Sequence, residues 1–207
     1  MLEITFIQAV LFFLIILFSV IFHELAHGWV AYFLGDPTPK NAKRLTLNPI
    51  YHLDPIGSVL VPLLMYFTVG IAFGWAKPVP VNPYNFRDKK YGNLKVAIAG
   101  PLANIFLALF FGLMARFLPS FLFAPSLVLI LSLVVQINLV LALFNLLPIP
   151  PLDGSHILFT FIPSLRYHQR MFTQYGFLII IVIVFLFGDK LFDLVSYLTS
   201  IIIGFSY

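Results

Sequence analysis

Residues 23–27 (His-Glu-Leu-Ala-His) have the side chains and the spacing of a metal-dependent hydrolytic site. On a helix, two histidines four positions apart lie one turn apart on the same face, so both imidazoles can bind one metal ion. Glu24 lies beside them, where its carboxylate can take a proton from water at the metal. Because the chain contains no cysteine, any further protein ligand has to be a histidine, an aspartate or a glutamate. The pattern predicts a zinc site.

A catalytic zinc ion needs a third protein ligand and leaves a fourth position for water. Asp153 is the first candidate, because it follows a run of prolines that restricts the backbone and lies at the end of an apolar run. The same residue can instead form a turn with Gly154 or cap the helix that follows. Four further candidates stay open from the sequence: His52, Asp54, His156 and His168.

The composition predicts an integral membrane protein. Hydrophobic residues make up 61% of the 207 and charged residues only 10%, whereas soluble domains have roughly 25% charged residues. Several runs without charge are long enough to cross about 30 Å of hydrocarbon. In such a chain a pair of packed histidines beside a surface glutamate is a poor alternative for residues 23–27, because a buried carboxylate costs about 2.5–3.5 kcal/mol.

The apolar runs predict an all-α polytopic membrane protein with about five membrane segments around a three-helix catalytic core. The first helix is expected from residue 4 to about 34, closed by Gly35-Asp36-Pro37. Further apolar runs cover residues 57–72, 94–118, 126–147 and 171–187, and an apolar tail, 191–203, either spans or lies at the interface. The proline-rich residues 74–85 are expected to be extended. We expect one membrane domain over residues 1–207, with a core at about 4–155 and C-terminal helices at 156–207.

The distribution of charge predicts the orientation. If Asp153 lies near the two histidines, one side of the membrane holds every lysine and arginine except Arg116 and Lys190, and this side is therefore cytoplasmic. The same assignment requires residues 57–72, or the stretch 57–85 as a whole, to re-enter rather than to span. We expect a plasma membrane protein with its active site near the cytosolic face. Because the positive charges lie in short loops between apolar runs, no nucleic acid partner is expected.

Three motifs together resemble the site-2 protease family of intramembrane zinc metalloproteases. They are HExxH at residues 23–27, GxxxN at 100–104 and NxxPxPxLDG at 145–154, and the resemblance covers about residues 4–155. It implies one Zn²⁺ per chain, with His23, His27 and Asp153 as ligands. It also implies Glu24 as the catalytic acid and base, and Asn104 and Asn145 as polar groups of the active site. Many relatives carry a PDZ or a CBS domain, and we expect neither in this chain.

The implied function is cleavage of transmembrane segments in membrane-protein substrates, with those substrates and the lipid bilayer as partners. Two alternatives remain: a catalytically inactive relative that binds membrane proteins, and a transporter. A transporter gives no reason for HExxH, and the sequence shows no inverted repeat. For Gln136 and Asn138, polar residues inside an apolar run, the expected role is hydrogen bonding between helices.

Overall fold

The computed structural model describes residues 6–61, 64, 77–117 and 125–204, and every regular element in this part of the chain is helical. The α-helices are α1 (Phe6–Phe33), α2 (Thr38–Asn41), α4 (Gly92–Phe117), α5 (Pro125–Asn145), α6 (Asp153–Phe161) and α7 (Gln169–Ile203). Short helical turns lie at Pro49–Tyr51, Pro55–Leu60, Pro83–Asn85 and Pro163–His168. The expected all-α fold is confirmed.

The first helix ends where the sequence predicted. Gly35 has a φ of 103°, in the left-handed region that favours glycine. Its N–H donates to the carbonyl of Tyr32, and the N–H of Asp36 donates to the carbonyl of Ala31. These two bonds form a Schellman motif, which satisfies carbonyl groups at the end of a helix. The motif turns the chain sharply, so that Asp36 lies directly against the last turn of α1.

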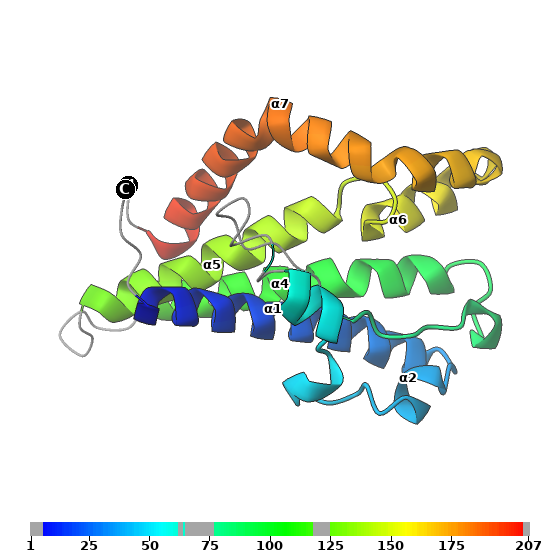
Figure 1. Ribbon diagram of the computed structural model, residues 1–207, viewed down its shortest axis with the longest axis horizontal. Coiled ribbons are helices and arrows are strands. Elements are labelled where there is room, and N and C mark those ends of the chain that lie inside the picture. The colour runs from blue at the N-terminus through cyan, green and yellow to red at the C-terminus, as the bar shows by residue number, and fades with distance from the viewer. Residues whose placement is uncertain (1–5, 62–63, 65–76, 118–124, 205–207) are drawn as a thin grey trace.

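Three long helices form the core and lie alongside one another (Figure 1). Each contains a stretch long and apolar enough to cross a membrane: Val10–Phe33, Gly92–Phe117 and Ser126–Asn145. They account for three of the about five membrane segments that we expected. Helix α4 runs back between α1 and α5, so the end of α1, the start of α4 and the end of α5 lie at one end of the molecule.

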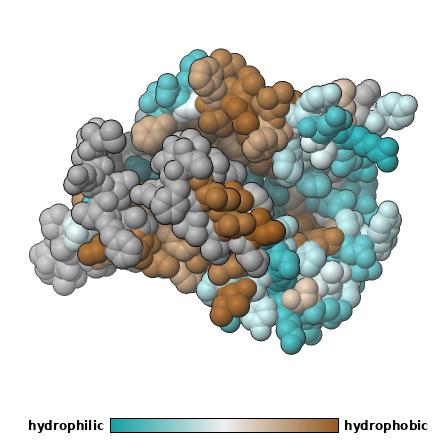
Figure 2. Space-filling model, in the orientation of Figure 1, coloured by the Kyte–Doolittle hydropathy of each residue, from teal (hydrophilic) through white to brown (hydrophobic). Residues whose placement is uncertain are grey.

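The two C-terminal runs, predicted separately as residues 171–187 and 191–203, form one helix. Helix α7 bends near its middle (Figure 1) and contacts both α4 and α5. Its second half completes an apolar core whose buried members include Ala108, Val135, Leu139, Val195 and Ile203. On the face shown in Figure 2, hydrophilic residues gather at the end of the molecule that carries α2.

The segment expected to re-enter lies only partly within the described residues. Its beginning forms the turn at Pro55–Leu60, whereas residues 65–76 lie outside the described part. Residues 77–82 have no regular structure, whereas Pro83–Asn85 form a short helical turn, so the extended chain predicted over residues 74–85 does not continue through residues 83–85. The N–H of Lys77 donates to the carbonyl of His52 at 2.9 Å. The chain therefore returns at residue 77 to the end of the molecule from which it left.

Candidate metal centre

Helix α1 places the imidazoles of His23 and His27 on one face, with their Nε2 atoms 3.0 Å apart. The first residue of α6, Asp153, brings its Oδ2 atom to 3.0 Å from Nε2 of His23 and 3.3 Å from Nε2 of His27. Both histidines are buried. The structure thus brings together the three residues for which the sequence pattern and the resemblance suggested a metal-binding role, and their ligand atoms lie within 4.8 Å of one another.

The second nitrogen of each imidazole is held by an acceptor. Nδ1 of His27 donates to the carbonyl of Val96 at 2.6 Å, and Nδ1 of His23 donates to Oδ1 of Asn104 at 2.6 Å. A carbonyl oxygen can only accept, so Nδ1 of His27 carries a proton, and in the neutral ring Nε2 therefore carries a lone pair. Hydrogen bonds of this kind orient the ligand rings in metal sites.

A chain of side-chain amides determines the orientation of Asn104. The amide nitrogen of Asn138 donates to the carbonyl of Val134 at 2.9 Å, so its oxygen faces Asn104. Asn104 therefore presents its own nitrogen, which donates to Oδ1 of Asn138 at 2.8 Å and to the carbonyl of Ser19 at 3.2 Å. Its oxygen is left to face His23. Nδ1 of His23 therefore carries a proton, and in the neutral ring Nε2 carries a lone pair, as in His27.

This donor set fits a metal cation. At neutral pH an aspartate is ordinarily a carboxylate, and the buried Oδ2 atom of Asp153 has no hydrogen bond with the described residues. Two nitrogen lone pairs and a carboxylate oxygen that converge this closely repel one another unless a positive charge lies between them. Nitrogen and oxygen ligands of these types are those of a catalytic zinc site.

Two glycines allow the helices to approach closely enough. A Cβ atom at Gly100 of α4 would overlap the Nε2 atoms of both histidines. A Cβ atom at Gly154 of α6 would overlap the carbonyl groups of Leu146 and Leu147, at the end of α5. The glycines of the GxxxN and LDG motifs therefore let α4 and α6 pack against the metal centre.

Glu24 lies in a cavity of about 410 Å³ beside the two histidines. Its Oε2 atom accepts a hydrogen bond of 2.7 Å from the N–H of Val79, in the non-helical segment that precedes the turn at Pro83–Asn85. Asn145 also lines this cavity, and its amide nitrogen donates to the carbonyl of Leu141 at 3.0 Å. Pro78, Val81 and His156 also line this cavity.

The structure separates the alternative ligand candidates from the cluster. His52 donates from Nε2 to the carbonyl of Thr46, and Asp54 accepts hydrogen bonds from the N–H groups of Ile56 and Gly57. His156 lines the cavity but is not a member of the three-residue cluster. The side chain of His168 lies outside the described part of the chain.

Sequence reasoning missed the contacts that orient the site. Asn138 forms the hydrogen bond between helices that was expected of it. Its link through Asn104 to His23 was not expected, because this link depends on the relative rotation of three helices. Ser19 gave a weak signal, since it lies one helical turn before His23 and faces the same side. The hydrogen bond from Val79 to Glu24 joins residues far apart in the chain, and no local pattern indicates it.

Comparison with known proteins agrees with this site. The model of the family described as "Peptidase family M50" matches residues 121–188 of the chain. A protein of Bacillus subtilis named "Putative zinc metalloprotease YwhC" is 43% identical over 169 residues, which cover 78% of this chain and 74% of that protein. "Putative zinc metalloprotease Rip2" of Mycolicibacterium smegmatis is 34% identical over 171 residues, covering 81% of this chain and 63% of that protein. We found no significant match among solved structures.

Three findings indicate a zinc metalloprotease of the membrane. The relatives carry that name, three apolar helices are long enough to span, and a metal ion could bind between His23, His27 and Asp153. The cofactor expected for the cluster is accordingly zinc, and the apolar helices make the chain an integral membrane protein. The chain belongs to Peptidase family M50, the site-2 protease family of zinc metalloproteases.

Proposed function

We propose that this metalloprotease is an endopeptidase that cleaves its substrates within the membrane, in their transmembrane segments. The observation that carries the proposal is the position of the donor cluster. His23 and His27 belong to Val10–Phe33, a stretch that is itself long and apolar enough to cross a membrane. A hydrolytic site on such a helix meets the peptide bonds of other membrane segments, which soluble proteases do not reach.

In this proposal His23, His27 and Asp153 hold one zinc ion. When bound there, zinc supplies Lewis acidity, which acidifies water and polarises a peptide carbonyl group. Asn104 is a positioning residue, because it holds the proton of His23 on Nδ1 through the amide chain described above.

Glu24 is assigned the proton transfers. The N–H of Val79 fixes one carboxylate oxygen at 2.7 Å. The other oxygen has no hydrogen bond with the described residues, and we assign to it the proton of the attacking water. Glu24 then delivers this proton to the nitrogen of the leaving amine, because the amine leaves easily only when protonated. A carboxylate that hydrogen-bonds on one side keeps a defined orientation through both transfers.

The two asparagines of the motifs take different roles in this mechanism. Asn104 is fully buried, and both of its N–H groups are used by Ser19 and Asn138. It therefore has no donor left for a developing oxyanion. Asn145 lines the cavity and donates one N–H to its own helix. Its second N–H has no acceptor among the described residues and is assigned to the carbonyl oxygen of the substrate.

The substrate has to unwind locally, because a transmembrane helix uses its carbonyl groups in its own hydrogen bonds. The non-helical segment that contains Pro78, Val79 and Val81 borders the cavity. We infer that an unwound stretch of substrate lies along this segment, with main-chain pairing of the kind seen when a peptide adds to a strand edge. We infer a plasma membrane location, and the charge distribution favours an orientation with the cavity near the cytosolic face.

Co-expression with candidate single-span membrane proteins tests the proposal. The native chain is expected to produce a fragment whose new terminus, read by mass spectrometry, lies within the apolar segment of the substrate. Glu24→Gln should produce none, whereas Asp193→Asn, the same change of a carboxylate in α7, should cleave normally. A fragment that persists with Glu24→Gln, or a new terminus in a soluble loop, contradicts the proposal. Absence of cleavage by the native chain against a broad substrate panel favours the inactive binding protein.

A further inference from the structure

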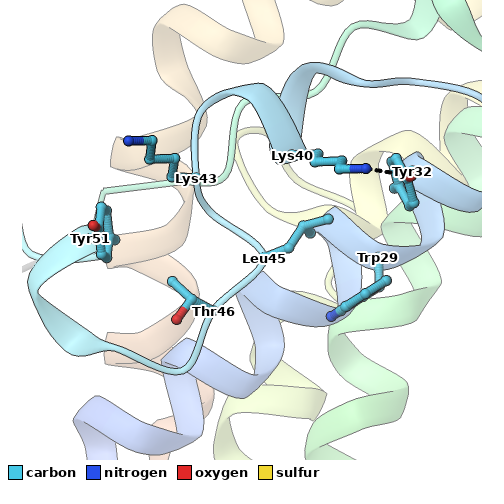
Figure 3. A pocket seen from close by; sticks show the side chains of 7 residues that line it. All are labelled: Trp29, Tyr32, Lys40, Lys43, Leu45, Thr46 and Tyr51. Atoms are coloured by element: carbon cyan, nitrogen blue, oxygen red, sulfur yellow. Dashed lines mark hydrogen bonds between the residues drawn. The ribbon is translucent and has the colours of Figure 1, made fainter.

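A second cavity, of about 500 Å³, lies against the last turns of α1, and none of its lining residues belongs to the metal centre. We call it the interfacial groove, and its lining residues are Trp29, Tyr32, Lys40, Lys43, Leu45, Thr46 and Tyr51. Figure 3 shows Trp29 and Tyr32 on α1 at one side, and Lys43, Thr46 and Tyr51 on the following loop at the other. The groove is thus formed between α1 and the segment that leads away from it.

The groove is positively charged. Lys40 donates from Nζ to the hydroxyl of Tyr32 at 3.1 Å and lies over the same ring. Neither Lys40 nor Lys43 forms an ion pair within the described part of the chain. The guanidinium of Arg44, bonded to the carbonyl of Tyr51, adds a third positive charge to this loop. The carboxylate of Asp36 is buried and already bonded to Thr38, Asn82 and Asn85.

The groove lies where an apolar span meets the polar end of the molecule. Val10–Phe33 is a candidate span, and three aromatic side chains pack together in its last turns. The ring centre of Trp29 lies 6.1 Å from the ring centre of Tyr32 and 5.7 Å from the ring centre of Phe33. Tryptophan and tyrosine at the ends of spans lie at the level of the lipid headgroups. The two lysines therefore lie at the depth of lipid phosphates.

We propose that the interfacial groove is a binding site for the headgroup of an anionic phospholipid. Lys40, beside the hydroxyl of Tyr32, donates to the phosphate at one side of the groove, and Lys43 at the other side adds to the positive potential that attracts it (Figure 3). Trp29 and Leu45 offer apolar surface to the glycerol and the first acyl carbons. Basic pockets beside membrane helices at the cytoplasmic surface recognise lipids by this chemistry. The proposal is independent of the protease mechanism.

A lipid bound in the groove also stabilises the packing of α1 against the loop. The side chain of Leu45 lies so close to Gly28 that a Cβ atom there would be 2.9 Å from its Cδ2 atom. Gly28 follows His27 directly, so the loop packs on α1 beside the metal centre. A ligand that binds only the folded protein raises its melting temperature. Anionic lipid is therefore expected to protect the purified protein against thermal unfolding.

Native mass spectrometry and thermal unfolding in mild detergent test the site, with phosphatidylglycerol, phosphatidylcholine and inorganic phosphate as separate probes. Phosphatidylglycerol is expected to bind at least about tenfold more tightly than phosphatidylcholine, since each lysine near the surface contributes to the attraction. It should also raise the melting temperature. Equal binding of the two lipids, or equal protection by inorganic phosphate, overturns the proposal.

The variant Lys40→Gln/Lys43→Gln should lose the preference for phosphatidylglycerol, whereas Lys89→Gln/Lys90→Gln, a pair in another loop at the same end, should keep it. A preference that survives the first pair, or that both pairs lose equally, contradicts a defined site. Lys43→Gln alone serves if the double variant is poorly folded, because the Lys43 side chain makes no hydrogen bond within the described residues. Glutamine also suits the positive φ of 56° at this position no worse than lysine. This single variant should weaken phosphatidylglycerol binding several-fold, and unchanged binding overturns the proposal.

Discussion

Each imidazole of the metal centre has a hydrogen-bond acceptor behind it, and these acceptors are of two kinds. The carbonyl of Val96 belongs to the main chain and cannot be removed by substitution. The acceptor for His23 is the side chain of Asn104, which itself depends on Asn138 and Ser19. The orientation of His23 is therefore the part of the site that a single change outside the three proposed ligands can disturb most easily.

The two motif asparagines should respond oppositely to the same substitution. Asn104→Leu should lower zinc affinity about 10–100-fold, the usual effect of removing a group that orients a metal ligand. Asn145→Leu should keep zinc affinity and lower kcat about 10²–10³-fold, as expected for loss of an oxyanion donor. Competition with a chelator measures the first quantity and cleavage kinetics the second. Asp153→Ala, which removes a proposed ligand, is the reference for full zinc loss. Unchanged zinc affinity in Asn104→Leu would rule out the positioning role.

The residues of the site differ in how far sequence alone could reach them. The pair His23 and His27 follows from helical spacing, which is a local property of the chain. The sequence left Asp153 as one of several third ligands, because its distance from the pair depends on how α5 and α6 pack. The contact of Asn104 with His23 spans 81 positions in the sequence, so no periodicity encodes it. Local geometry was therefore predictable, whereas the relative rotation of helices was not.

At the scale of elements, Asp36 joins three segments. Its carboxylate accepts hydrogen bonds from the main chain and hydroxyl of Thr38 at the start of α2, from the N–H of Asn82 and from the amide of Asn85. Burial raises the pKa of Asp36, but these hydrogen bonds outweigh it and hold the pKa below its usual value. The bond at Asn82 lies three residues after Val79, which orients Glu24. Asp36 thus anchors the segment that borders the cavity.

Asp36→Asn should lower the melting temperature at pH 7, because an amide nitrogen then faces N–H donors; the loss corresponds to about 1–3 kcal/mol. Since the folded-state pKa of Asp36 is lowered, its contribution is complete above the unfolded pKa of about 3.9 and is lost as the pH falls through the folded value. The difference between native and variant should therefore shrink below about pH 3.9. Thermal unfolding of both proteins at a series of pH values from 7 to 3 measures this difference in melting temperature.

The control for this change is Asp88→Asn. The hydrogen bond from Lys95 and those from the N–H groups of Tyr91 and Lys90 lower the pKa of Asp88 against a small opposing effect of burial, but this carboxylate lies at the surface. Exposed ion pairs contribute little to stability, so Asp88→Asn should melt close to the native protein at every pH. Equal losses in both variants would show that Asp36 is not a specific anchor.

At the scale of the whole molecule, the polar loops meet at one end. The N–H of Arg87 donates to the carbonyl of Leu34, so the loop before α4 touches the end of α1. Asp36 binds the same loop through Asn82 and Asn85. This agrees with the prediction that the loops around Asn41 and Lys90 share one side of the membrane. The path of residues 65–76 lies outside the described part of the chain, so the re-entrant segment stays a prediction.

Reporter fusions test this arrangement in cells. Reporters placed after Asn41 and after Lys90 should both report the cytoplasm, and one placed after Pro119 should report the opposite side. The physical reason is that the loops on the proposed cytoplasmic side carry nearly all lysines and arginines. Opposite readings at Asn41 and Lys90 would mean that residues 57–72 cross the membrane fully. The orientation assigned to the metal centre would then be wrong.

The central claim is that Glu24 performs proton transfer at a zinc ion held by His23, His27 and Asp153. The direct measurement is zinc content and cleavage rate of purified native protein and Glu24→Gln, on the same membrane substrate. We expect one zinc per chain and similar melting temperatures in both proteins, with kcat at least about 10²-fold lower in the variant and substrate affinity nearly unchanged. A Glu24→Gln protein that retains zinc and cleaves at the native rate would show that Glu24 does not transfer the proton.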